Sequence, residues 1–329
     1  MAPDFIGIGA QKAGTTWLYR NLRSHPDLWL PPVKELHYFD EKARLGPHRL
    51  HRKLFGSSKR DQRWRRQVRR EWRTRKAGHE GSRRWLFRYF TGTPSDDWYR
   101  SLFAGHERLT GEITPSYTTL SRGDVQRVAE VAPDAKVILL LRNPIERAFS
   151  ASVMRTKHMP IDELRRAYRI AFDTEWSELN TDYERALRNW SVHYPPDRIF
   201  VGFLEDVSRA PRRLLKRLYR FLEVPFPDSL GEAGRVIHKG SQTTMPTWAA
   251  GYLARKYRPL IDGLADRFGG HTEFWRFTAD EIAHLDPERD EEIPYPFWET
   301  AMWDRFAHDH DETDVQSDLL ITLDGGRHG

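Results

Sequence analysis

The stretch from Phe5 to Leu22 constrains the fold most, because it reads as a strand, a glycine loop and the start of a helix. Its first residues form a short apolar run, typical of a buried strand. Gly9 and Gly14 then bracket a tight loop, and Thr15 begins a stretch with helical spacing. Such a turn aims backbone N–H groups and the positive end of a helix at an anion. The sequence therefore predicts an α/β fold with an anion site at this loop.

The loop departs from both common nucleotide-binding motifs. A P-loop requires G-x-x-x-x-G-K-[ST]; Gly9 and Gly14 have that separation, but Thr15 occupies the lysine position. The loop's lysine is Lys12, where a dinucleotide fingerprint would place its third glycine. The pattern indicates a phosphate-type group with a cation beside it. An ATP-dependent phosphotransferase related to the P-loop enzymes stays open, with Thr16 as the hydroxyl partner of magnesium.

The loop and the start of the helix are formed by Gln11, Lys12, Ala13, Gly14, Thr15, Thr16 and Trp17. This run resembles the 5′-phosphosulfate loop of sulfotransferases that use 3′-phosphoadenosine 5′-phosphosulfate (PAPS). The resemblance implies that these residues bind the donor, with backbone N–H groups and threonine hydroxyls on the 5′-phosphate. It also implies that Lys12 stabilises the departing adenosine 3′,5′-bisphosphate (PAP) and that Trp17 stacks on adenine.

A second segment, from Val33 to Asp40, alternates so that Glu35 and His37 would share one face of an extended chain. A carboxylate beside an imidazole can take a proton from an attacking group, provided that it reaches that group. A solvated strand end is the other interpretation. The run from Lys34 to Asp40 resembles the segment that carries the catalytic glutamate of heparan sulfate-type carbohydrate sulfotransferases. The resemblance implies that Glu35 is the general base, that His37 orients it or acts in its place, and that both contact the acceptor.

The stretch from Gly111 to Tyr117 predicts a strand that runs into a turn, and it resembles the Glu-x-Thr-Pro-x-Tyr run of the same family. The resemblance implies an acceptor-side role for Glu112, whereas a buried carboxylate paired with an arginine is the structural alternative. The heparan sulfate enzymes carry a lysine after this glutamate, and Ile113 stands there in this chain. The acceptor therefore need not be the same sugar polymer.

The run Lys136–Leu141 is the clearest strand, because its apolar residues are continuous, as in a parallel strand covered on both faces. Arg142 and Ser150 would then lie at the C-terminal edge of the sheet, where α/β folds bind ligands. The stretch resembles the family's 3′-phosphate site, and guanidinium and hydroxyl groups are good phosphate donors. An arginine salt-bridged at a strand end is the alternative. Lys239 and Gly240 resemble the Lys-Gly pair of a loop that lies over the same phosphate in this family, and a surface turn is the alternative.

Composition limits the other classes of protein. The 329 residues are 39% hydrophobic, enough for the core of one large α/β domain or of two domains. The absence of cysteine excludes disulfides and thiolate chemistry. The formal net charge of +6 favours anionic ligands without naming one. We expect a cytoplasmic protein, because no apolar run approaches the ~20 residues of a spanning helix and the first residues lack a signal-peptide pattern.

Residues 45–92 depart from the compact pattern and predict a basic helical insertion. Trp64, Val68 and Trp72 lie at helical spacing among many arginines. A solvated helix packed on the body, a clamp for anionic polysaccharide or lipid head groups and a nucleic-acid contact are the three interpretations. Nucleic acid ranks last, because no zinc finger or aromatic RNA-binding motif accompanies the helix. A non-catalytic anion-binding module built on this insertion remains a further class of function.

We expect one domain over residues 1–280, with a P-loop-like central parallel sheet flanked by helices on both faces, and a C-terminal extension or tail over 281–329. The expected function is in-line transfer of a sulfuryl group from PAPS to a hydroxyl or amine of a carbohydrate, glycolipid or small molecule, which releases PAP. The resemblance implies no metal, and the run from His308 to Glu312 reads as a solvated acidic segment. The oligomeric state and the acceptor, including whether it is anionic or lipid-linked, remain open.

Overall fold

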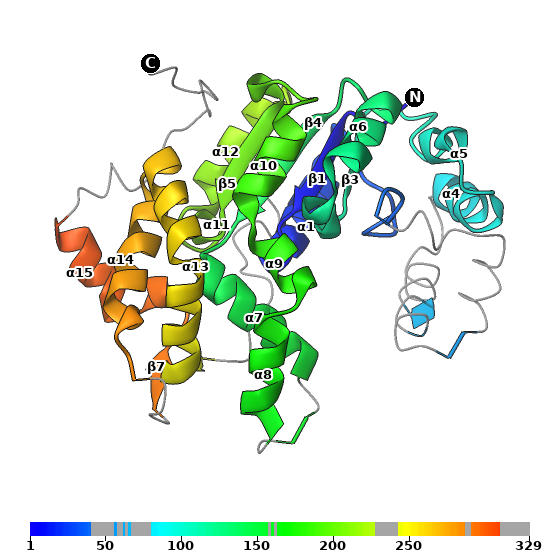
Figure 1. The fold of residues 1–329 in the computed structure, drawn as a ribbon. Coiled ribbons are helices and arrows are strands. Elements are labelled where there is room, and N and C mark those ends of the chain that lie inside the picture. The colour runs from blue at the N-terminus through cyan, green and yellow to red at the C-terminus, as the bar shows by residue number, and fades with distance from the viewer. Residues whose placement is uncertain are drawn as a thin grey trace.

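The centre of the molecule is a five-stranded parallel sheet with the order β2-β3-β1-β4-β5 (Figure 1). This confirms the predicted α/β class. The computed structural model describes residues 1–40, 56–57, 62, 65–66, 80–156, 159–160, 163–227, 243–286 and 291–309. The strands of the sheet are β1 Phe5–Gly9, β2 Leu28–Trp29, β3 Leu109–Ile113, β4 Lys136–Leu141 and β5 Ile199–Phe203.

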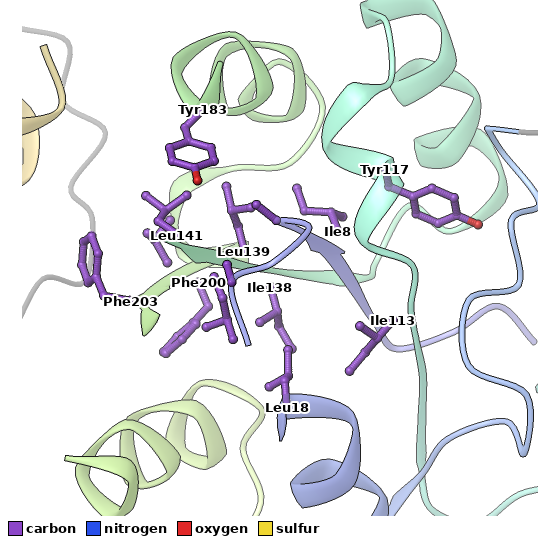
Figure 2. Packing of buried hydrophobic residues seen from close by; sticks show 14 of the residues in the cluster. Ile8, Leu18, Ile113, Tyr117, Ile138, Leu139, Leu141, Tyr183, Phe200 and Phe203 are labelled. Carbon is purple, nitrogen blue, oxygen red and sulfur yellow. The ribbon is translucent and has the colours of Figure 1, made fainter. Parts of the chain in front are cut away.

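β1 lies in the middle of the sheet, with β3 on one side and β4 on the other. All five of its residues are buried, because helices cover both faces of the sheet. Figure 2 shows Leu18, on the helix after β1, and Tyr183 on opposite sides of the strands. The chain runs from β1 to the edge strand β2, returns through β3 and then crosses to β4. The direction of the connections therefore changes at β1, and folds of this type bind ligands outside the carboxyl ends of the strands at that point.

Helices connect the strands and build the layers on the two faces. α13 and α14 pack together, and α13 also contacts α7, the helix that follows β4. The helices are α1 Thr15–Ser24, α4 Glu80–Thr91, α5 Asp96–Ser101, α6 Arg122–Val131, α7 Pro144–Thr156, α8 Leu164–Phe172, α9 Glu175–Thr181, α10 Tyr183–Ser191, α11 Leu204–Arg209, α12 Pro211–Phe221, α13 Thr247–Phe268, α14 His271–Ala283 and α15 Ala301–Asp309. Short 3₁₀ helices are η2 Pro115–Thr119, η4 Pro196–Arg198 and η5 Phe297–Glu299.

The described part of the C-terminal extension folds onto the domain. β6 (Thr244–Pro246) pairs antiparallel with β7 (Glu292–Pro294), and α15 packs against α14. Phe297 and Phe306 are fully buried in the main hydrophobic core. Residues 291–309 are therefore part of the packed body and do not form a tail.

Before β3, one segment adds a short strand to the sheet and another differs from the expectation. The proline-rich link after α1 contains the short edge strand β2, which pairs in parallel with β3. The segment from Val33 to Asp40 contains no strand, so the extended chain that its alternation suggests is wrong. Glu35 and His37 have φ values of 66° and 55°, and these left-handed residues break the alternation of side chains between two faces.

The predicted basic insertion ends in α4, which is part of the packed body. Trp85 and Tyr89 of this helix are buried with their rings stacked at 5.0 Å. Trp85 Nε1 donates to the carbonyl of Leu102, just after α5, at 2.8 Å. The stripe predicted at Trp64, Val68 and Trp72 lies outside the described residues.

Candidate active site

The loop after β1 ends at Gly14, which caps the N-terminus of α1. Gly14 has a φ of 86°, a left-handed conformation that glycine adopts without the steric penalty of a Cβ atom. Within the described residues no side chain caps this helix, and its first turn carries no acidic residue. The positive end of the helix dipole is therefore not compensated by the described side chains, and such a terminus suits an anion.

Lys12 lies within this loop and has a φ of 73°. Burial and the positive charge of Arg142 lower the pKa of Lys12, and no carboxylate of the described residues offsets these effects. Arg142 Nη1 donates to the Lys12 carbonyl at 3.1 Å, which joins the end of β4 to the loop after β1. Lys12 therefore has a second cation beside it and no counter-charge among the described residues. An anion bound here would balance the positive charges of Lys12 and Arg142.

Among the other loop residues, the burial of Trp17 bears on its predicted contact with adenine, and Gln11 has a buried polar atom. Ala13 and Trp17 are 0% and 1% exposed and belong to the hydrophobic core. A ring buried to this extent cannot stack on adenine unless the core opens, so the predicted adenine contact of Trp17 is not supported by its position. Gln11 differs from both, because its side-chain oxygen is buried without a hydrogen-bond partner among the described residues.

Lys34 connects the loop to the predicted base. Its Nζ lies 3.5 Å from Thr15 Oγ1 and 3.4 Å from Thr16 Oγ1. The same ammonium group donates to Glu35 Oε1 at 3.0 Å. Alternation along an extended chain would place the side chains of Lys34 and Glu35 on opposite faces, so their contact is not evident from the sequence. The backbone of Glu35 is left-handed, so alternation between two faces does not hold where the side chains of Lys34 and Glu35 meet.

Glu35 and His37 lie close together, and two further residues extend the chain of polar contacts. His37 Nε2 lies 3.6 Å from Glu35 Oε2, and His37 Nδ1 lies 2.8 Å from Asp40 Oδ2. Ser116, on η2, donates to the same Asp40 oxygen at 2.5 Å. The imidazole therefore lies between two carboxylates. Asp40 belongs to the motif that resembles the family, but nothing in the pattern of the sequence indicates Ser116.

The neighbours of Glu35 and His37 keep both side chains charged at neutral pH. Burial opposes the charge on Glu35, but the hydrogen bond with His37 and the charge of Lys34 outweigh it and lower the pKa of Glu35 to about 2. Burial also opposes protonation of His37, but its hydrogen bonds with Asp40 and Glu35 outweigh burial and raise its pKa to about 9. Glu35 is then a carboxylate that can accept a proton, whereas His37 is an imidazolium that cannot.

Glu112 is connected to the segment from Lys34 to Asp40 through two hydroxyl groups. The N–H of Leu36 donates to Thr114 Oγ1 at 3.1 Å, and the N–H of Tyr38 donates to the Tyr117 hydroxyl at 3.0 Å. Both hydroxyls in turn donate to the Glu112 carboxylate, at 2.7 Å from Thr114 and 3.2 Å from Tyr117. The backbone on both sides of His37 is thus tied to one buried carboxylate.

The burial of Glu112 agrees with the structural alternative of a buried carboxylate, but its hydrogen-bond partners do not. Its side chain is 1% exposed, and a third hydroxyl, that of Tyr99, donates to Oε1 at 2.5 Å. Burial raises the pKa of Glu112. The carboxylate therefore does not face the solvent as an acceptor-binding group would, and its partners are hydroxyls instead of an arginine.

Arg142 follows β4 and is buried, with hydrogen bonds in three directions. Nε donates to Glu146 Oε2 at 3.3 Å, Nη1 donates to the carbonyl of Lys12, and Nη2 donates to the hydroxyl of Tyr295. The predicted salt bridge at a strand end and the predicted place beside the loop are therefore both present. Burial raises the pKa of Tyr295, and Ser150, on α7, is near enough to act on that pKa in the opposite direction.

Lys239 and Gly240 lie outside the described residues, so their contact with a 3′-phosphate stays a prediction. In the part of the chain that the structure covers, no three His, Asp or Glu side chains gather as a set of metal ligands. The described helices also include none with the length and apolar character needed to cross a membrane.

These features define an α/β protein in which the predicted anion site, at the N-terminus of α1, has a charged carboxylate beside it. A model described as "Sulfotransferase family" matches residues 3–228, so the chain belongs to the sulfotransferase family. This confirms the family that the motifs predicted.

Two curated relatives illustrate the similarity. Human heparan sulfate glucosamine 3-O-sulfotransferase 3A1 is 29% identical over 229 residues, which cover 67% of this chain and 44% of that protein. Human heparan sulfate glucosamine 3-O-sulfotransferase 6 is 33% identical over 135 residues, which cover 38% of this chain and 39% of that protein. The chain thus spans less than half the length of these relatives.

A solved structure supports the fold. The crystal structure of a sulfotransferase from Alicyclobacillus acidocaldarius is 23% identical, with a TM-score of 0.53. The superposition covers 81% of this chain and 95% of that one, so the shared architecture extends beyond the central sheet.

Proposed function

We propose that this protein transfers the sulfuryl group of PAPS to a hydroxyl or amine of a carbohydrate, glycolipid or small-molecule acceptor. The observation that carries the proposal is the position of Lys34, whose ammonium group contacts the threonines of the loop and the carboxylate of Glu35. The predicted donor loop and the predicted base are therefore separated by one side chain. The carbohydrate named for the curated relatives supports this class of acceptor.

The described residues fit a donor with a phosphate at its 5′ end. Lys12 is a partly buried cation without a carboxylate partner among them, and the N-terminus of α1 has no side-chain cap. The hydroxyls of Thr15 and Thr16 lie beside the same terminus. Arg142, linked to the loop through the Lys12 carbonyl, is the residue that we assign to the second phosphate of the donor.

PAPS supplies the sulfuryl group, and its transfer leaves negative charge on the 5′-phosphate. Lys12 stabilises that charge, since a fixed cation where charge develops lowers the barrier without reorganisation. Glu35 accepts the proton of the acceptor, because it is ionised at neutral pH. His37 orients Glu35 and does not replace it, because its raised pKa keeps it protonated. The proposal gives no role to a metal.

A cytoplasmic location, a non-nucleic-acid acceptor and the role of the basic insertion stay predictions from the sequence. The identity of the acceptor is the largest open question, since Ile113 replaces the lysine that heparan sulfate enzymes carry beside their acceptor.

The test is a transfer assay with ³⁵S-labelled PAPS and a panel of sugars, glycolipids and small hydroxyl compounds. Label in an acceptor together with stoichiometric PAP is the expected result. Calorimetry with PAP and with ATP–magnesium separates this function from the phosphotransferase alternative. Binding of ATP–magnesium without binding of PAP would overturn the proposal.

A further inference from the structure

The hydroxyl of Tyr295 lies beside the residues predicted to bind the 3′-phosphate. Arg142 Nη2 donates to this hydroxyl, and Ser150 is near enough to lower the pKa of Tyr295 against the larger, opposite effect of burial. Tyr295 follows β7, is 8% exposed and lies 153 residues after Arg142 in the chain. The matched family region ends at residue 228, so this contact comes from a part of the chain beyond it.

The segment around Tyr295 is fixed at this place by its backbone. The N–H of Tyr295 donates to the carbonyl of Thr243 at 2.9 Å. Two residues later, the N–H of Phe297 donates to Glu146 Oε1 at 2.6 Å. The second oxygen of Glu146 accepts the bond from Arg142 Nε. One buried carboxylate thus binds both the C-terminal segment and the arginine.

The side chains of the same segment enclose the guanidinium group. Arg142 Cζ lies 5.5 Å from the ring centroid of Tyr295 and 5.7 Å from that of Trp298, within the range of cation–π attraction. Its three hydrogen bonds to described residues use three of the five N–H donors of an arginine. A phosphate group that reaches Arg142 therefore finds only two guanidinium donors, and further donors must come from neighbouring side chains.

We propose that Tyr295 is a further donor-binding residue, whose hydroxyl binds the 3′-phosphate of the nucleotide together with Arg142 and Ser150. The proposal rests on the proposed function, because it assumes a nucleotide with a 3′-phosphate. A tyrosine hydroxyl has both a donor and an acceptor role. In the free protein it accepts a hydrogen bond from Arg142, and with ligand bound it donates to a phosphate oxygen while the arginine supplies charge.

The test is calorimetry of the full chain with two ligands, PAP and adenosine 5′-phosphate, which lacks the 3′-phosphate. Tyr295→Phe keeps the ring against Arg142 and removes only the hydroxyl. Because a hydrogen bond to a charged group contributes more than a neutral one, we expect affinity for PAP to fall about tenfold. Affinity for adenosine 5′-phosphate should stay within about twofold.

Tyr194→Phe is the matched control. The Tyr194 hydroxyl is also buried and donates to the carbonyl of Ala132, before β4, at 3.0 Å. This variant loses a buried hydrogen bond at the opposite end of the sheet, and it should bind both ligands like the wild type. If Tyr295→Phe leaves PAP binding unchanged, strengthens it, or weakens both ligands equally, the assignment is wrong. Strengthened binding would show that Tyr295 blocks the site.

Failure of the proposed function gives a different result, because the wild-type protein would then not bind PAP at all. A second measurement needs no variant and so does not depend on the stability of Tyr295→Phe. Amide hydrogen exchange of the wild-type chain over residues 291–299 should slow more with PAP than with adenosine 5′-phosphate, at equal saturation. Equal protection by the two ligands would overturn the role of this segment.

Discussion

Arg142 Nη1 donates a hydrogen bond to the backbone carbonyl of Lys12 at 3.1 Å. The bond links the residue that follows β4 to the loop that follows β1, and it helps to hold Lys12 in a backbone conformation that only glycine adopts easily. The two predicted phosphate sites are therefore not independent.

The lowered pKa of Lys12 predicts how PAP binding depends on pH. Lys12 must be protonated to attract the ligand, and burial together with the charge of Arg142 makes it lose its proton at a lower pH than an ordinary lysine. Bound phosphate favours the charged form and raises that pKa again. We therefore expect PAP affinity to fall as pH rises through the lowered pKa, with proton uptake on binding. Calorimetry in buffers of different ionisation enthalpy measures both.

Lys12→Met should weaken PAP binding by about 10- to 100-fold and remove this alkaline dependence. Lys136→Met is the control, because Lys136 pairs with Glu223 at the start of β4, away from the loop. An identical pH dependence in the wild type and in Lys12→Met would contradict the assignment of Lys12.

Glu35→Gln tests the proposed base. The amide is close in size to the carboxylate but cannot accept the proton, so kcat should fall by about 10²- to 10⁴-fold. PAP affinity should change little, because Lys12 and the loop are intact. The measurement is steady-state transfer with an acceptor found in the screen, together with calorimetry of PAP. Near-normal kcat in this variant would remove Glu35 from the mechanism.

Asp40→Asn tests the electrostatic contacts of His37. Asp40 contributes the leading hydrogen bond that raises the pKa of His37 to about 9, so its loss should move that pKa toward the ordinary value of 6.5. Because the folded value is the higher one, His37 stabilises the fold fully below about pH 6.5 and loses this contribution as pH rises through about 9. The stability of Asp40→Asn should lose most of this dependence on pH.

NMR titration of the His37 ring protons measures the shift directly, and urea unfolding between pH 6 and 10 measures its effect on stability. Asp173→Asn is the control, because Asp173 pairs with Lys256 on α13. A wild-type His37 that titrates near its ordinary value would show that the contact with Asp40 is absent in solution.

Part of this site could be predicted from the sequence because its signals are local. The separation of Gly9 and Gly14 and the apolar run into β4 each reflect a few neighbouring residues, and they indicated the loop, the parallel sheet and the position of Arg142. The proximity of Glu35 and His37 was also expected, but from an extended chain that does not exist. Their side chains meet in a segment whose φ values are positive, and hydrophobic alternation carries no information about φ.

The remaining contacts could not be predicted because they join distant parts of the chain. Ser116 reaches Asp40 across 76 residues, and Tyr295 reaches Arg142 across 153. Neither tyrosine nor serine at these positions differs from an ordinary surface or core residue in the sequence. Glu112 was recognised as a motif residue, but its burial under three hydroxyls follows from the packing of α5, η2 and the segment from Lys34 to Asp40.

Glu112 should act on catalysis through the backbone of the segment from Lys34 to Asp40. Its carboxylate accepts hydrogen bonds from Thr114 and Tyr117, and these hydroxyls accept the N–H groups of Leu36 and Tyr38. In Glu112→Gln one oxygen becomes an NH₂ group that faces a hydroxyl donor. The free energy of unfolding should fall by about 1–3 kcal/mol, the cost of a mispaired buried polar group.

A loss of stability alone would not distinguish positioning from general damage, so the kinetic pattern decides. Because His37 lies between the two tethered amides, kcat should fall by about tenfold or more in Glu112→Gln, since small displacements at a reacting centre are costly. PAP affinity should stay within about twofold, because the described hydrogen bonds of the Glu112 carboxylate go to Tyr99, Thr114 and Tyr117, outside the loop after β1. Tyr117→Phe removes the hydroxyl that holds Tyr38 and should show the same pattern more weakly.

Tyr194→Phe loses a buried hydrogen bond elsewhere and should lose stability without loss of kcat. Equal losses of kcat and PAP affinity in Glu112→Gln would mean that the carboxylate supports the whole fold and does not position the segment that carries Glu35 and His37.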